Sequence, residues 1–425
     1  MNAILPNPMF EATRLTREGR LAEASALLQR LLRGEAPAAT AATTPQDIGA
    51  PVSGRLPRMI DVDPETGEAS GPAPAPEPRT ATAGRWSTAG LGTATMPQMP
   101  DALRGLLDQF NQGGLAQGLG GLPQGSIARA AEPLPDGAQF VAGSFSSDAG
   151  RRGYKLYIPG IHRGEAVPLV VMLHGCTQSP DDFAAGTRMN ALAEEHGILV
   201  LYPAQPSSAN AQKCWNWFSP GDQRRNEGEP SLIAGMTRQV MREHAVDPRR
   251  VYVAGLSAGG AAAAIMGQAY PDLYAAVGVH SGLACGAARD LPSAFAAMRQ
   301  GATTAPLRAG DTQRVIPTIV FHADRDTTVH PRNGDQVIMQ SGAAAASRFQ
   351  VEIQRGQVVG GHAYSRTLHA NAAGQTVLEQ WLVHGGGHAW SGGSPAGSYT
   401  DPRGPDASRE MLRFFLEHSQ SATAS

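Results

Sequence analysis

The pentapeptide G-L-S-A-G centred on Ser257 occurs once in the chain and constrains the fold more than any other stretch. Apolar residues at 251–254 indicate a buried strand before it, and the alanine-rich run 261–268 indicates a helix after it. A strand that turns this tightly into a helix needs positions almost free of side chain on both sides of the turn. The two glycines of the pentapeptide meet that demand. We therefore expect Ser257 on a strained turn at the end of a strand.

The chain from residue 137 to 420 alternates apolar runs with helical patterns. This alternation predicts an α/β fold, in which a mostly parallel sheet is covered by helices on both faces. A strand hairpin is expected first, and a second hairpin is expected as an insertion over 351–374. The other expected strands are 167–173, 198–202, 251–254, 275–279, 318–322 and 377–383, and the expected helices are 181–196, 231–244, 261–268 and 407–418.

The first 136 residues differ in composition from the rest of the chain. All eight tyrosines and four of the five tryptophans lie after residue 137, which places the packed core there. Residues 35–136 are rich in Ala, Pro, Thr and Gly and predict a largely disordered linker, with a short helix near 100–112. Residues 1–34 predict an amphipathic helical segment. Such a segment docks on the main domain or a partner, or it anchors to a granule or lipid surface.

The overall charge and the missing motifs exclude several classes of function. A net charge of −2 gives no reason to expect nucleic acid as a partner. No apolar run is long enough for a transmembrane segment. The N-terminus shows no recognisable secretory signal, so we expect a cytoplasmic protein by default. No dinucleotide or Walker-type loop and no zinc-ligand spacing occurs, so no cofactor and no metal are predicted.

A serine on such a turn becomes a nucleophile only with a base, and the base needs an acid to orient it. In this architecture the order along the chain is serine, acid, histidine, with the last two placed after later strands. We assign His388 as the base and Asp326 as the orienting acid. Asp324 is the alternative acid, and His384 is the alternative base.

An oxyanion formed at the serine needs two backbone N–H donors. We expect them from Ala258, directly after the serine, and from Cys176, in the loop after the strand 167–173. For His174 in the same loop, a structural role is expected.

Aromatic residues gather near the expected site. Trp215 and Trp217 belong to a C-W-N-W-F cluster, and Trp390 follows the proposed base. These rings either pack in the core or form a substrate-binding wall. Three cysteines do not make a disulfide framework, and three reduced thiols are the simpler interpretation, with one bridge as the alternative.

The combined motifs resemble the poly(3-hydroxybutyrate) depolymerase family of esterases, to which feruloyl and acetyl xylan esterases are related. The motifs are L-H-G-C-T-Q, C-W-N-W-F, A-G-L-S-A-G-G, H-A-D-R-D-T-T-V-H-P, G-G-G-H-A-W-S-G-G and D-P-R-G-P-D-A-S. The resemblance implies an α/β-hydrolase fold and a triad of Ser257, Asp326 and His388. It also implies that Cys176 and Cys214 pair, which would leave Cys285 free.

The function expected from these observations is metal-independent ester hydrolysis by a serine enzyme. Poly(3-hydroxybutyrate) or its oligomers are the first expected substrate, and an aryl or acetyl carbohydrate ester is the second. A different class remains open, an interaction protein that coats granules through its N-terminal arm. The family resemblance also makes the extracellular region an alternative location.

Overall fold

The computed structural model describes residues 134–302 and 315–420. The predicted helical segment 1–34, the predicted helix near 100–112 and almost all of the predicted linker lie outside these residues, so they stay predictions.

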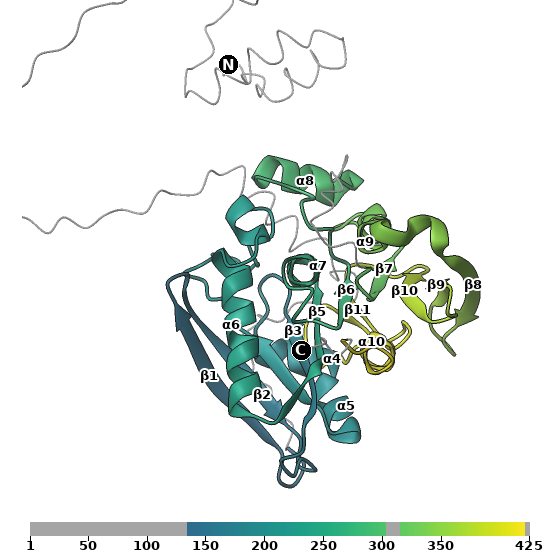
Figure 1. Cartoon of the computed structure of the whole chain (residues 1–425). Helices are drawn as coiled ribbons and strands as arrows, with labels where there is room; N and C mark the ends of the chain where they lie inside the picture. The colour runs from purple at the N-terminus through teal and green to yellow at the C-terminus, as the bar shows by residue number, and fades with distance from the viewer. Residues whose placement is uncertain (1–133, 303–314, 421–425) are drawn as a thin grey trace, which may run out of the picture. The chain divides into compact units, whose positions relative to one another are not determined.

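A ten-stranded sheet organises the described residues (Figure 1). Its strand order is β1-β2-β4-β3-β5-β6-β7-β10-β9-β8. The six strands from β4 to β10 in this order are mutually parallel, and the two strands at each end of the sheet are antiparallel. The bounds are β1 Gln139–Ser147, β2 Gly150–Ile158, β3 Val167–Leu173, β4 Leu199–Pro203, β5 Val246–Leu256, β6 Ala276–His280, β7 Thr318–Ala323, β8 Gln350–Gln357, β9 Ala363–Ala370 and β10 Thr376–Val383.

Helices cover both faces of this sheet, as the alternation of strands and helices predicts. Successive side chains of a strand point to opposite faces, so Val171 of β3 packs in one core cluster and Met172 in the other. Helices α6, α7, α8 and α9 contribute to the first cluster, and α4, α5 and α10 to the second. The bounds are α4 Pro180–Thr187, α5 Met189–His196, α6 Gly228–Glu243, α7 Ala258–Ala269, α8 Leu291–Gln300, α9 Arg332–Gly342 and α10 Ala407–Leu416.

The structure corrects the expected helix over 181–196, which is two helices. Arg188 separates α4 from α5 with a φ of 55°, in the left-handed region that ends a helix. The hydroxyl of Thr187 donates to the carbonyl of Phe183, and the Met189 amide donates back to this hydroxyl. The serine helix begins at Ala258, three residues earlier than expected. The helices α8 and α9 were not expected from the sequence.

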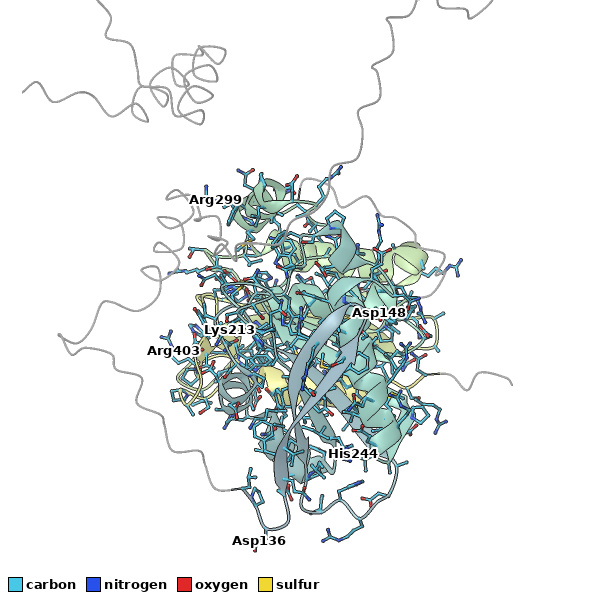
Figure 2. All side chains as sticks on the ribbon, turned by 90° about the vertical axis from the view of Figure 1, so that its left-hand side faces the viewer. Asp136, Asp148, Lys213, His244, Arg299 and Arg403 are labelled. Carbon is cyan, nitrogen blue, oxygen red and sulfur yellow. A yellow bond between two sulfur atoms is a disulfide. The ribbon has the colours of Figure 1, made fainter. Side chains whose placement is uncertain are left out.

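A hairpin of two strands forms each end of the sheet. At one end, β1 and β2 form the expected hairpin, and Figure 2 places Asp136 and Asp148 at its two ends. At the other end, β8 and β9 form the second expected hairpin. In β8 the side chains of Val351 and Ile353 are each 57% exposed. β8 is the last strand of the sheet at this end, so one of its edges has no neighbour among the described strands.

The parallel strands bring their carboxyl ends to one edge of the sheet. Leu256 at the end of β5 pairs with His280 of β6, which in turn pairs with Phe321 of β7. Phe321 also pairs with Trp381 of β10. The loops that follow β5, β7 and β10 therefore start side by side. In open α/β sheets this edge is where functional residues gather.

Candidate active site

Ser257 occupies the turn between β5 and α7 that the sequence predicts. Its φ of 57° and ψ of −118° lie outside the regions that ordinary L-residues adopt. A Cβ atom added to Gly255 would lie 2.3 Å from the carbonyl oxygen of Gly259, and one added to Gly259 would lie 2.0 Å from that of Leu173. Only glycine fits at both places. The Ser257 amide donates to the His280 carbonyl at 2.9 Å, which fixes the turn.

Asp326 and His388 form a carboxylate–histidine pair, with 2.7 Å between Oδ2 and Nδ1. A carboxylate only accepts, so His388 Nδ1 carries the proton and Nε2 is left as the basic nitrogen. The other oxygen of Asp326 accepts from the amides of Thr328 and Val329 at 2.9 and 2.8 Å. Burial would raise the pKa of Asp326, but the charge of His388 and hydrogen bonds from His322 and His388 outweigh it, so the pKa lies far below its usual range.

The alternative acid and the alternative base pair with one another. Asp324 Oδ2 lies 2.9 Å from His384 Nδ1, and Asp324 Oδ1 accepts from the Gly385 amide at 2.7 Å. Both side chains are more than a third exposed, whereas the Asp326 side chain is fully buried. The structure therefore joins Asp326 to His388 and keeps the alternatives in a second, separate pair.

The loop after β3 is held against the serine turn. A Cβ atom at Gly175 would lie 3.5 Å from the Leu256 carbonyl oxygen, so this backbone passes close to the end of β5. Cys176 forms a disulfide with Cys214, and Cys285 is free. The pairing implied by the family resemblance is confirmed, and the expectation of three reduced thiols is wrong.

The two proposed oxyanion donors are backbone amides on this loop and on the serine turn. Ala258 is the first residue of α7, where backbone N–H groups have no partner within the helix. Cys176 lies in the loop that the disulfide fixes. Their roles stay proposals.

His174 has the structural role expected for it. Its Nε2 accepts from the Gln205 amide at 3.1 Å, so Nδ1 carries the proton and donates to the Gly175 carbonyl at 2.8 Å. Burial lowers the pKa of His174 to about 4, which keeps the ring neutral at pH 7. Trp215 is fully buried and its indole donates to the His174 carbonyl at 3.1 Å.

The other two tryptophans considered for substrate binding are also buried. Trp217 is 6% exposed and packs edge-on against Phe218. Trp390 is 1% exposed, and its indole donates to Ser408 Oγ at 3.0 Å. The three rings match the core-packing interpretation, and substrate binding by them stays a prediction.

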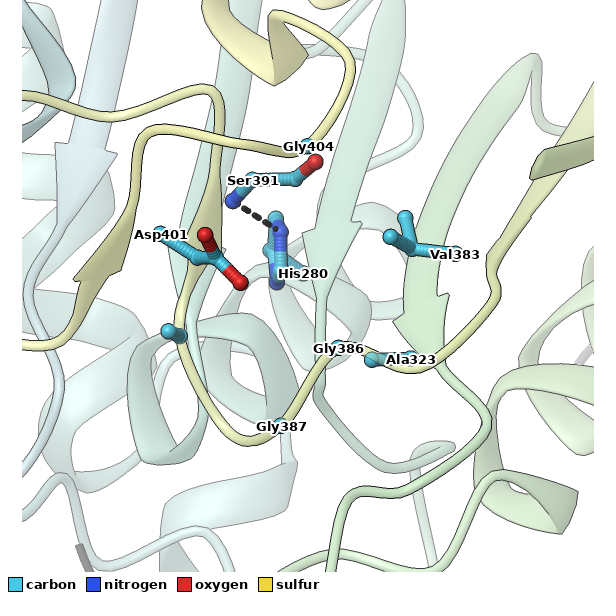
Figure 3. A pocket seen from close by; sticks show the side chains of 9 residues that line it. His280, Ala323, Val383, Gly386, Gly387, Ser391, Asp401 and Gly404 are labelled. Atoms are coloured by element: carbon cyan, nitrogen blue, oxygen red, sulfur yellow. Dashed lines mark hydrogen bonds between the residues drawn. The ribbon is translucent and has the colours of Figure 1, made fainter. Parts of the chain in front are cut away.

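His280 is a site residue that the sequence analysis missed. Its ring stacks on Trp390 and Phe321, and its Nε2 accepts from the Ser391 amide at 2.9 Å (Figure 3). Burial, with the nearby charges of His322 and His388, lowers the pKa of His280 to about 3. The ring lines a cavity beneath the loop that carries His388. A histidine at the end of an otherwise apolar strand was the available signal.

Two further structural findings concern metals and membranes. Within residues 134–302 and 315–420, no group of three or more His, Cys, Asp or Glu side chains is arranged to hold a metal ion. None of the described helices is long and apolar enough to cross a membrane.

The strained serine turn at the centre of a mostly parallel sheet, with a carboxylate–histidine pair at the same edge, is the arrangement of the α/β-hydrolase fold. Acetyl xylan esterase from Aspergillus awamori has a similar structure, with a TM-score of 0.52 at 20% identity over 66% of this chain and 99% of that one.

Sequence comparison shows which proteins the chain resembles. Residues 152–346 match the family model described as esterase PHB depolymerase. The chain is 34% identical over 230 residues to poly(3-hydroxyalkanoate) depolymerase C of Paucimonas lemoignei, covering 52% of this chain and 54% of that protein. It is 29% identical over 188 residues to feruloyl esterase B of Thermothelomyces thermophilus, covering 41% of this chain and 64% of that protein. Residues 152–346 of this chain therefore resemble the PHB depolymerase family of esterases, and the chain spans 54% and 64% of the lengths of these two curated relatives.

Proposed function

We propose that this protein hydrolyses carboxylic esters through an acyl-enzyme formed on Ser257. The observation that carries the proposal is the 2.7 Å contact between Asp326 and His388, located at the sheet edge where Ser257 sits on its strained turn. His388 Nε2 takes the proton of the serine hydroxyl as the oxygen attacks the ester carbonyl. Asp326 fixes the tautomer and stabilises the imidazolium.

The tetrahedral oxyanion is stabilised by the amides of Cys176 and Ala258. As this intermediate collapses, the protonated His388 gives its proton to the leaving alcohol, and Ser257 keeps the acyl group. Water, deprotonated by His388, then attacks the acyl-enzyme. As the second tetrahedral intermediate collapses, His388 returns this proton to the serine oxygen, and the carboxylic acid leaves.

Poly(3-hydroxybutyrate) or its oligomers are the substrates that we propose first, because the relative with 34% identity is named as a poly(3-hydroxyalkanoate) depolymerase. An aryl or acetyl carbohydrate ester is the second candidate, favoured by the relative named as a feruloyl esterase. Attachment to a polymer granule through residues 1–136 is part of the proposal for the first substrate. Sedimentation with isolated granules, with and without these residues, tests that attachment.

The disulfide bears on the location of the protein. Disulfides persist mainly in oxidising compartments, and the bond between Cys176 and Cys214 holds the loop of a proposed oxyanion donor. We therefore favour an extracellular or other oxidising location over the cytoplasmic default. Alkylation of thiols in protein taken directly from its native host, followed by mass spectrometry, tests this.

The decisive experiment is hydrolysis of p-nitrophenyl butyrate by the wild-type protein and by Ser257→Ala. We expect the variant to lose at least about 10³-fold in kcat, as nucleophile removal does in serine hydrolases. Equal turnover by both proteins would refute the mechanism. Hydroxybutyrate oligomers and methyl ferulate are then compared by kcat/KM. A preference for the ferulate would move the substrate to the carbohydrate-ester class.

A further inference from the structure

The loop after β7 and the loop after β10 are joined by a ladder of backbone hydrogen bonds. The Asp324 amide donates to the Val383 carbonyl at 3.0 Å, and the Arg325 amide donates to the Gly386 carbonyl at 3.2 Å. Asp326 and His388 form the last contact between the two loops. The proposed acid and the proposed base are therefore carried by two segments that hold each other along their length.

Asp324 adds two side-chain bonds at the start of this ladder. One oxygen accepts from the Gly385 amide at 2.7 Å, and the other contacts His384 Nδ1 at 2.9 Å. His384 Nδ1 must donate to the carboxylate, so in the neutral ring Nε2 accepts from the hydroxyl of Ser365 at 2.9 Å. Both nitrogens of His384 are thereby fixed.

Ser365 lies within β9, paired with Leu382 of β10, and not on a strained turn like that of Ser257. Its hydroxyl hydrogen-bonds to the His384 ring. Ser365 does not lie on a strained turn, which is the feature that indicates Ser257 as the nucleophile. The chain of contacts from Ser365 through His384 to Asp324 connects the hairpin at the sheet end to the loop after β7.

The fixed position of His384 matters because a segment of glycines separates it from His388. Three consecutive glycines, 385–387, lie between His384 and His388, and Gly385 has a φ of 84°. Glycine has the largest conformational freedom of any residue, so such a segment does not set the position of the next side chain by itself. The loop is held at its start by Asp324, in its middle by the bond from the Arg325 amide to Gly386, and at its end by Asp326.

We propose that Asp324 is a positioning residue for the reaction, acting through His384 and Gly385 to hold the His388 imidazole in register with Ser257. The inference rests on the proposed esterase function. A small displacement of a base relative to its nucleophile is enough to slow catalysis by about a hundredfold, without changing how substrate binds.

The test uses the full-length protein and p-nitrophenyl butyrate. Asp324→Ala removes both side-chain bonds, and we expect kcat to fall about 10- to 100-fold with KM unchanged within about twofold, the range typical for residues that orient a functional histidine. Asp324→Asn keeps an oxygen for the Gly385 amide, so we expect it to recover most of the lost kcat. Wild-type kcat in Asp324→Ala would overturn the proposal, as would an equal loss in both variants.

The matched control is Glu195→Gln, which also removes an exposed carboxylate from a pair, here with Arg409 at 3.1 Å. We expect its kcat to stay at the wild-type value. If Asp324→Ala does not fold, His384→Gln replaces it. That variant leaves the bond from Gly385 to Asp324 in place, and we expect a smaller loss of kcat. An unchanged kcat in folded His384→Gln would overturn the proposal.

A measurement independent of turnover separates this inference from the proposed function. The His388 Nδ1 proton, bonded to Asp326, is expected to give a low-field proton NMR signal that disappears in Asp326→Asn. In Asp324→Ala we expect this signal to broaden or shift, whereas an unchanged signal would overturn the positioning role. If the wild-type protein shows no Ser257-dependent turnover, the proposed function fails, and the NMR signal still decides whether Asp324 positions His388.

Discussion

Cys176 and Cys214 lie 38 residues apart in the sequence and are joined by a disulfide, with their Cα atoms 4.2 Å apart. The bond fastens the loop after β3 to the start of the C-W-N-W-F cluster. The next residue in that cluster, Trp215, donates its indole hydrogen to the His174 carbonyl. The loop that carries the proposed oxyanion donor, the Cys176 amide, is therefore held in place by a disulfide and a hydrogen bond.

Replacing both bonded cysteines by serine is expected to lower the free energy of unfolding by about 4 kcal/mol, from the chain-entropy cost of a loop of this length. It should also reduce kcat, because the Cys176 amide is released from its fixed position. Urea denaturation and p-nitrophenyl butyrate kinetics measure the two effects. Cys285→Ser is the control, since this thiol is free and burial raises its pKa to about 11. A double variant as stable as this control would contradict the prediction.

Asp326→Asn is expected to lower kcat by about 10⁴-fold, as the equivalent change does in serine proteases with this triad. An amide nitrogen facing His388 favours the tautomer with its proton on Nε2, which removes the base from the serine. The ester kinetics of this variant are compared with those of Asp272→Asn, an exposed carboxylate paired with Arg225. The assignment of the acid would be reversed if Asp324→Asn lost activity to this extent while Asp326→Asn kept it.

Stability is expected to fall as the pH is lowered from 7 to 5, because two buried histidines stay neutral in the folded state. The pKa values of His174 and His280 are lowered to about 4 and about 3, whereas in the unfolded chain both bind protons below about pH 6.5. The unfolded state therefore gains protons first. The stabilisation of the folded state by the two neutral histidines is complete above pH 6.5. It decreases as the pH falls, and at pH 5 the two groups together have lost about 3 to 4 kcal/mol of it.

Urea denaturation at pH 7 and pH 5 measures this loss. His174→Asn removes one of the two groups, so we expect roughly half the pH dependence in that variant, whatever its stability at pH 7. An identical pH dependence in wild type and variant would show that other groups cause it.

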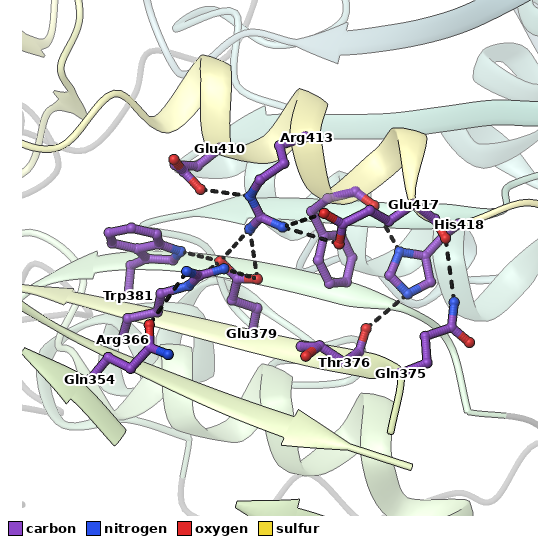
Figure 4. Close-up of polar contacts among 11 residues, drawn as sticks. Gln354, Arg366, Gln375, Thr376, Glu379, Trp381, Glu410, Arg413, Glu417 and His418 are labelled. Atoms are coloured by element: carbon purple, nitrogen blue, oxygen red, sulfur yellow. Dashed lines mark hydrogen bonds and ion pairs between the residues drawn. The ribbon is translucent and has the colours of Figure 1, made fainter. Parts of the chain in front are cut away.

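Glu379 is expected to be the most important buried charge for stability at the β10–α10 contact. Its side chain is fully buried, with Arg366 and Arg413 each donating to both of its oxygens (Figure 4). Glu379→Ala leaves both guanidinium groups without this partner, and we expect a loss of about 3 kcal/mol in unfolding free energy, at the low end for a broken buried pair because both arginines are partly exposed.

Glu410→Gln is the control for this prediction, because it removes a partly exposed partner of Arg413 alone. We expect a change below about 1 kcal/mol there, typical of exposed ion pairs. Thermal or urea unfolding compares the two variants. Similar losses of unfolding free energy in both variants would mean that the burial of Glu379 does not determine its contribution to stability.

The features predicted correctly from the sequence are those set by local pattern. The turn at Ser257 follows from glycines that no other residue can replace, and β3 follows from an unbroken apolar run. Chain order places an acid and a histidine after β7 and β10. It does not separate Asp326 and His388 from the alternatives Asp324 and His384, which lie at equally suitable positions. Only the three-dimensional register of the two loops decides which acid meets which histidine.

Other features depend on context that a single sequence does not carry. The break at Arg188 needs a left-handed backbone at a residue with no preference for it. The helix α8 is different, because its signal is in the sequence and was not used: Asp290 and Ser293 form a capping box, and Pro292 lies inside the first turn. The burial of Trp215 and Trp390 results from contacts with distant residues, His174 and Ser408, which composition does not reveal.

The open strand β8 has a consequence for anyone who handles the purified protein. An exposed strand edge offers unpaired backbone groups to any extended chain, and Val351 and Ile353 add an apolar strip along one side of it. We expect edge-to-edge association at this strand when the protein is concentrated. Substituting Lys for Ile353 places a charge on the strip and is expected to extend the shelf life of the preparation without altering its chemistry.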